Sequence, residues 1–202
     1  MDGQVRILDQ HAKSRVLTRI AEEIVRRRPD QQDPLDEYLE RLGWQFVDGT
    51  LIPIDVFDVA DLAELPGDAR ADLVKAATRL RDGDLDGALT SACAAVDSVT
   101  DSVYATHGLK SQSSDGFQAR CSTAIKAKRV ITELTAELNA LGWNQADAEK
   151  LAQNLRGALN HGAYVMQTLR SRMGDVHGSK PVLKPLVFDS LKWAALLVRV
   201  MK

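Results

Sequence analysis

Residues 83–108 read GDLDGALTSACAAVDSVTDSVYATHG, and the predicted fold follows chiefly from this stretch. Its apolar residues recur at spacings of three and four, which predicts one apolar stripe along a helix that ends at Gly108. The stripe consists of Leu85, Leu89, Ala92, Val96, Val99 and Val103. Such a helix needs partners of the same kind, because its apolar face must be buried. The stretch therefore predicts a helical bundle.

The partner helices follow from the same periodicity. Helices are expected over residues 68–82, 117–141, a long segment after the N-cap Asn144, and 186–201. The long helix is expected to bury Ala148, Leu151, Leu155, Ala158, Gly162, Val165 and Leu169 on one face. Short connections favour antiparallel packing of neighbouring helices. We therefore predict an all-α fold with an antiparallel helical bundle over residues 68–202.

The first third of the chain has a different pattern. Helices are expected over residues 5–28 and 34–42, the first with apolar positions Val5, Leu8, Ala12, Val16, Ile20 and Ile24. Residues 44–53 alternate in polarity around Asp48-Gly49, a strong hairpin signal. We therefore predict a small N-terminal region of helix plus β-hairpin (1–67) in front of the bundle domain (68–202).

Composition excludes some classes of protein, and the distribution of charge adds a direction. Of the 202 residues, 45% are apolar and 27% are charged, which is ordinary for a globular chain and excludes disordered, collagen and rod-like ones. The net charge of -2 hides an acidic middle (30–101; 5 basic, 17 acidic) and a basic end (151–202; 8 basic, 2 acidic). A local basic excess steers polyanions to one face. The alternative is that it packs beside the acidic middle.

Compartment and cofactor expectations follow from what the sequence lacks. It shows no signal-peptide pattern and no apolar run of membrane-spanning length, so we expect a cytoplasmic protein without membrane contact. Cys93 and Cys121 lie in expected helices without metal-ligand spacing. Buried free thiols are therefore expected, with no metal site and no disulfide. Phosphate-loop and other cofactor motifs are missing, so no cofactor is expected.

Residues 169–178, LRSRMGDVHG, close the long helix and combine cations with a histidine. Histidine transfers protons near neutral pH, and arginine binds phosphate through two hydrogen bonds. Together they meet the minimum for metal-independent RNA cleavage, in which His moves a proton and Arg stabilises the growing negative charge. The alternative is that His177 caps the end of the helix.

Two other cationic features have structural interpretations. Arg156 and His161 are five residues apart, which aligns them poorly on a helix, so we expect residues 160–162 to meet neighbouring helices or a dimer interface. The run 26–28 of three arginines lies at a helix C-terminus, where cations complement the helix dipole. We favour this interpretation over an RNA-binding arm.

Two stretches, 83–97 and 169–178, resemble the HEPN superfamily, and most closely its abortive-infection C-terminal family. The first resembles the family's second helix, in which Asp97 matches an acidic residue near the active face. The second resembles the signature LRNxxGDAHG, an Arg-x6-His motif here formed by Arg170 and His177, with Arg172 as a neighbouring cation. The resemblance extends over residues 68–202.

The resemblance implies an HEPN-like helical bundle, a homodimer that brings two Arg–His pairs into one cleft, and a metal-independent endoribonuclease. It also implies a toxin or phage-defence role, with single-stranded or transfer RNA as substrate and an antitoxin or defence protein as partner. Arg170 and His177 would be catalytic. Asp97, Ser171, Arg172 and Asp175 would support them or bind RNA. We further hypothesise that Asp97 orients Arg170 or His177, which an Asp97 turned to solvent would contradict.

Two positions depart from the family pattern and motivate alternatives. Ser171 stands where active members often carry Asn, Asp or His, and Ser179 stands where members silenced by adenylylation carry Tyr. Ser171 motivates a non-catalytic HEPN module that binds RNA, a nucleotide or a partner protein. A third hypothesis is a helical dimerisation domain whose N-terminal region binds a defence partner.

Overall fold

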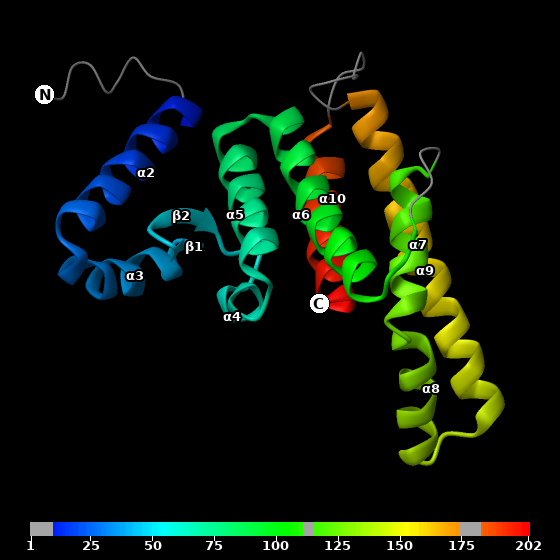
Figure 1. Cartoon of the computed structure of the whole chain (residues 1–202). Helices are drawn as coiled ribbons and strands as arrows, with labels where there is room; N and C mark the ends of the chain where they lie inside the picture. Colours follow the sequence, from blue (N-terminus) through cyan, green and yellow to red (C-terminus); the bar gives the residue numbers. More distant parts are fainter. Residues whose placement is uncertain (1–9, 111–114, 174–182) are drawn as a thin grey trace, which may run out of the picture.

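A computed structural model describes residues 10–110, 115–173 and 183–202. The elements are the helices α2 (Gln10–Arg27), α3 (Gln32–Arg41), α4 (Val59–Ala63), α5 (Gly67–Asp82), α6 (Leu85–Thr106), α7 (Phe117–Ala127), α8 (Val130–Ala140), α9 (Gln145–Met173) and α10 (Lys184–Met201), the 3-10 helix η1 (Pro29–Gln31) and the strands β1 (Trp44–Val47) and β2 (Thr50–Pro53). Figure 1 shows a predominantly helical molecule. The all-α prediction is thus confirmed, with one small hairpin among the described residues.

Helix α6 lies at the centre of the bundle. It packs against α5 and α10 and also contacts α7 and α9. The Asp84 carboxylate caps its first turn by accepting a 3.0 Å hydrogen bond from the backbone N–H of Gly87. The predicted stripe is buried from Leu89 to Val103, and Leu85 packs against its edge. Helices consecutive in the chain run antiparallel in the pairs α5–α6 and α9–α10 (Figure 1).

The long helix α9 begins as predicted but buries a different face. The Asn144 side chain accepts a 2.9 Å hydrogen bond from the backbone N–H of Asp147, which confirms the N-cap. Of the predicted face, Leu151, Ala158 and Val165 are exposed. The buried residues are Ala148, Ala152, Leu159, Gly162, Ala163, Met166 and Leu169. The prediction was partly wrong because apolar residues lie on more than one side of this helix, and its neighbours select the side.

The predicted single helix over 117–141 is divided into two. Helix α7 ends at Ala127, and α8 starts after Arg129, whose φ of 56° is left-handed and cannot continue a helix. Helix α8 has no buried residue and packs along the first half of α9. Figure 1 shows these two segments extending away from the rest of the bundle.

The predicted hairpin is confirmed. Val47 pairs with Thr50 across a two-residue turn in which Asp48 and Gly49 have φ values of 51° and 75°. Positive φ at both positions is the type I′ geometry that Asp-Gly favours. Val47 and Ile52 belong to the same buried core as the helices that follow, so packing is continuous across the boundary between residues 67 and 68.

Helix α2 does not bury the predicted face. Val16, Ile20 and Ile24 are exposed, whereas Thr18 and Val25 are buried. The physical reason is that α2 directs Glu22 inward, where its carboxylate pairs with the buried guanidinium of Arg81 at 2.6 Å. Val5 and Leu8 lie outside the described residues, as does the side chain of Ala12. In the described ranges, no helix has the length and apolar character needed to cross a membrane.

Candidate functional site: an arginine–aspartate cluster

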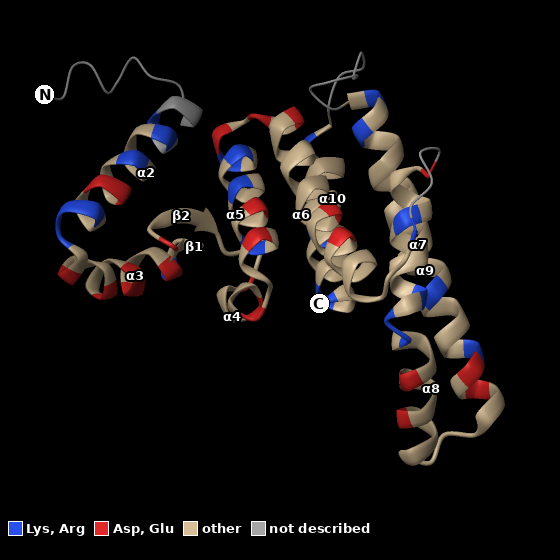
Figure 2. Ribbon diagram, viewed as in Figure 1, with Lys and Arg blue, Asp and Glu red and all other residues tan. Residues whose placement is uncertain are grey.

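Arg170 lies in the last turn of α9, one residue after Leu169. Leu169 is buried and fixes this turn against the bundle, so the neighbouring Arg170 side chain projects to the surface and is 45% exposed. A cation in the last turn also complements the negative end of the helix dipole. Figure 2 shows basic residues at this end of α9 and along α7.

Asp97 meets Arg170 from α6. The Nη1 group of Arg170 donates a 2.7 Å hydrogen bond to Oδ2 of Asp97. Val96 and Val99 are buried on either side in sequence, which places Asp97 at the edge of the core with a side chain only 25% exposed. A partly buried carboxylate requires a partner, and a charge-assisted bond of this length is a strong one. The expected contact between Asp97 and Arg170 is therefore present.

Arg120 of α7 completes the site, and sequence reasoning missed it. Its Nη1 lies 3.5 Å from Oδ1 of Asp97, and its Nη2 forms an ion pair with Asp101, one turn further along α6. We call Asp97, Asp101, Arg120 and Arg170 the arginine–aspartate cluster. The only sequence signal for it is the i, i+4 spacing of the two aspartates, which creates an acidic patch on one helix face.

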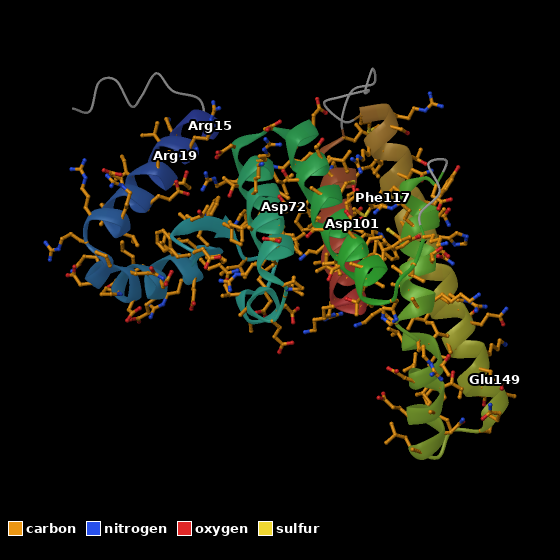
Figure 3. The ribbon with its side chains drawn as sticks, viewed as in Figure 1. Arg15, Arg19, Asp72, Asp101, Phe117 and Glu149 are labelled. Atoms are coloured by element: carbon orange, nitrogen blue, oxygen red, sulfur yellow. The ribbon has the colours of Figure 1, made fainter. Side chains whose placement is uncertain are left out.

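Aromatic rings lie beside both guanidinium groups. The Cζ of Arg120 is 5.7 Å from the centre of the Tyr104 ring, and that of Arg170 is 6.0 Å from the Phe117 ring. Figure 3 labels Asp101 on α6 and Phe117 on α7, where these two helices adjoin. Cation–π contacts of this kind hold a guanidinium in place and leave its N–H groups free to donate.

Ser171 and Arg172, the other predicted site residues that the structure describes, are not brought into the cluster. The Ser171 hydroxyl donates a 3.0 Å hydrogen bond to the carbonyl oxygen of Thr168 in its own helix, and Arg172 is exposed. Asp175 and His177 lie outside the described residues. Arg156 and His161 are both exposed. Next to His161, Gly162 is packed so tightly that an added Cβ would lie 2.3 Å from the Trp193 ring of α10.

The two cysteines are buried free thiols, as predicted. The pKa of Cys93 is raised to about 12, chiefly by burial, with Arg170 opposing the rise and the nearby Asp97 carboxylate adding to it. Burial also raises the pKa of Cys121 to about 12. Both thiols are therefore protonated and inert at neutral pH. No group of three or more metal-ligating side chains occurs among the described residues.

The site is therefore a partly exposed pair of arginines held by two aspartates at the junction of α6, α7 and α9. The guanidinium group of Arg170, the more exposed of the two, can bind the non-bridging oxygens of a phosphodiester. Comparison with protein-family models, with curated proteins and with solved structures finds no match for this chain. The assignment of function consequently depends on the geometry of the site and on the residues themselves.

Proposed function

We propose that the protein is a metal-independent endoribonuclease of the HEPN type, acting as a toxin or as an abortive-infection and phage-defence effector. The observation that carries this proposal is the Asp97–Arg170 hydrogen bond. It holds an arginine at the end of α9, seven residues before His177 in the sequence. Arginine held in this way is suited to phosphate binding, and histidine is suited to proton transfer.

The proposed chemistry is attack of a ribose 2′-hydroxyl on the adjacent phosphorus. His177 takes the proton of the 2′-hydroxyl or delivers one to the leaving 5′-oxygen, and Arg170 binds the phosphate oxygens as negative charge accumulates. The new O2′–P bond replaces the P–O5′ bond, so the products carry a 2′,3′-cyclic phosphate and a 5′-hydroxyl. Arg172, Ser171 and Asp175 lie next to this pair in the sequence and are proposed to support it or to bind RNA.

The proposal includes partners and a compartment. A homodimer would place two Arg170–His177 pairs in one cleft, so that one histidine acts as base and the other as acid. The substrate is single-stranded or transfer RNA, no metal or other cofactor takes part, and the protein acts in the cytoplasm. An antitoxin or defence protein is proposed to restrain or trigger it.

A non-catalytic HEPN module that binds RNA, a nucleotide or a protein is the second candidate. The specific observation in its favour is the Ser171 hydroxyl, which is engaged by the Thr168 carbonyl of its own helix. An asparagine amide at this position, as in many active members, would have additional donor and acceptor atoms for substrate.

Growth and RNA integrity after induced expression in bacteria distinguish the two candidates. Wild type is expected to arrest growth and fragment RNA, whereas Arg170→Ala and His177→Ala are expected to do neither. Arg156→Ala is a matched control, because it removes an exposed arginine from the same helix and should leave toxicity intact. Toxicity of His177→Ala equal to wild type would refute the ribonuclease, and RNA binding without cleavage would favour the module.

A further inference from the structure

We propose that Arg120 is a positioning residue of this site, which neutralises Asp97 from α7 so that Arg170 remains available to RNA phosphate. The inference rests on the proposed function and adds a residue to which neither the sequence motif nor the resemblance points. In the Asp97–Arg170 pair, the carboxylate of Asp97 opposes the binding of phosphate to Arg170. A carboxylate 2.7 Å from a guanidinium competes with any phosphate for the same N–H donors and repels the phosphate charge.

The position of Arg120 allows it to offset the negative charge of Asp97. Arg170 approaches Oδ2 of Asp97, whereas Arg120 approaches Oδ1 from the other side at 3.5 Å. Among the described residues, the bond from Nη1 to Asp97 is the only hydrogen bond that the Arg170 side chain makes. The other N–H groups of its planar guanidinium thus remain able to donate to a phosphodiester while Asp97 stays compensated by Arg120.

Arg120 itself is poorly placed to bind RNA directly. Its side chain is 22% exposed, half the value for Arg170, and is held between the Tyr104 ring and the Asp101 carboxylate. Its Nε is buried and has no hydrogen-bond partner among the described residues. A buried donor without a partner is costly, so this position is better explained by the charge that Arg120 supplies to Asp97 and Asp101 than by hydrogen bonding alone.

The net charge of the cluster predicts whether each substitution weakens or strengthens RNA binding. The cluster holds two guanidinium groups and two carboxylates, so its formal charge is zero. Arg120→Met would leave a net negative charge beside Arg170, and RNA phosphate would be repelled. Adding Asp101→Asn to this variant restores zero charge without restoring any packing by the Arg120 side chain. A charge role therefore predicts rescue by Asp101→Asn, and a packing role predicts none.

The test measures kcat and KM for a fluorescent single-stranded RNA, together with the Kd of its 2′-O-methyl analogue, which lacks the attacking hydroxyl. We expect Arg120→Met to raise KM and Kd by about tenfold, the effect of one charge-assisted contact. Arg120→Met/Asp101→Asn should recover most of this loss. The matched control is Arg41→Met, which removes an exposed arginine paired with Glu37 on α3 and should change neither constant.

A third variant, Asp101→Asn alone, tests the charge role even if Arg120→Met does not fold. Asp101 is 65% exposed, so Asp101→Asn should fold normally and, by leaving the cluster net positive, should lower KM and Kd by a few-fold. An unchanged KM and Kd in folded Arg120→Met, absence of rescue in the double variant, or weaker binding by Asp101→Asn would each overturn the proposal. If wild type binds the analogue but cleaves no RNA, the Kd values still decide the role of Arg120, and only the proposed ribonuclease fails.

Discussion

Asp97 has two effects on the site, because its carboxylate both orients Arg170 and opposes phosphate. The hydrogen bond from Arg170 fixes the guanidinium, whereas the negative charge of Asp97 disfavours a bound polyanion. Steady-state kinetics distinguishes the two effects. Orientation of Arg170 stabilises the transition state and therefore changes kcat, whereas the net charge of the site affects substrate binding and therefore changes KM.

Asp97→Asn is therefore expected to lower kcat by about tenfold without raising KM, because the amide keeps an acceptor for Arg170 but loses the charge-assisted bond. Steady-state kinetics on single-stranded RNA measures both constants. Asp72→Asn on α5 is the control, as it removes an acidic side chain that is outside the cluster. A rise in KM with unchanged kcat would show that Asp97 contributes to RNA binding and does not orient Arg170.

The thiols of Cys93 and Cys121 provide a test of burial. Both have a folded-state pKa near 12, above the ordinary value of 9.0 that the unfolded chain approaches. Above pH 9 the unfolded chain thus loses thiol protons that the folded chain keeps. The contribution of the two protonated thiols to the unfolding free energy is therefore complete below pH 9 and is lost as the pH rises from 9 towards 12.

We expect iodoacetamide at pH 8.5 to leave both thiols unmodified in folded protein and to modify both in urea, as measured by mass spectrometry. The unfolding free energy should fall between pH 9 and pH 11, and Cys93→Ala/Cys121→Ala should reduce that fall. Rapid labelling of folded protein would contradict the burial of these side chains.

The residues of the cluster differ in how far the sequence predicts them. The Asp97–Arg170 contact was anticipated because a family resemblance singled out both positions, although they are 73 residues apart. Arg120 carried no such signal, since a lone arginine in a helix is ordinary. Only the folded arrangement of α6 and α7 brings it to the two aspartates.

Among the elements, α2 is held by a buried ion pair and by Val25 and Ala21, which pack in a small cluster with Phe46 and Leu51, and not by its predicted apolar stripe. The Arg81 side chain is 1% exposed and pairs with Glu22 of α2 at 2.6 Å and with its neighbour Asp82 at 2.7 Å. Its Nη1 also donates a 2.6 Å hydrogen bond to the Leu51 carbonyl oxygen. One guanidinium therefore connects α2, β2 and α5.

Arg81→Met is expected to lower the unfolding free energy by about 3–5 kcal/mol, because it leaves the Glu22 carboxylate without its buried partner. Urea titration followed by circular dichroism gives this value. Arg19→Met is the matched control: it is 68% exposed, lies near the same Glu22 and Asp82, and should cost less than about 1 kcal/mol. Equal losses of unfolding free energy in the two variants would show that burial of Arg81 does not stabilise the packing of α2, β2 and α5.

Element positions were predictable where a local signal is strong. The hairpin follows from Asp48-Gly49, and the start of α9 follows from Asn144, because turn and cap geometry depend on a few adjacent residues. The buried faces of α2 and α9 were not predictable, because apolar residues lie on several sides and distant partners choose between them. The break at Arg129 was missed because no glycine or proline marks it.

At the scale of the whole molecule, the hairpin and the bundle share one core. Val47, Ile52, Val56 and Phe57 belong to the same cluster of buried residues as the stripe of α6. In the sequence, apolar residues recur with a period of two in the hairpin and of 3.6 in the helices, which distinguishes the two parts. This periodicity does not show whether the apolar faces of the two parts pack against each other. Figure 2 shows acidic residues on α3, far along the chain from the cluster, and basic residues along α2 as well as at the end of α9.

The proposed reaction is cleavage of RNA through its 2′-hydroxyl by Arg170 and His177, without a metal. Its most direct test is the cleavage rate of a labelled single-stranded RNA in excess EDTA, for wild type, Arg170→Ala and His177→Ala, with mass spectrometry of the product ends. We expect cleavage by wild type alone, with 2′,3′-cyclic phosphate and 5′-hydroxyl ends. Loss of activity in EDTA, or cleavage by His177→Ala at the wild-type rate, would contradict it.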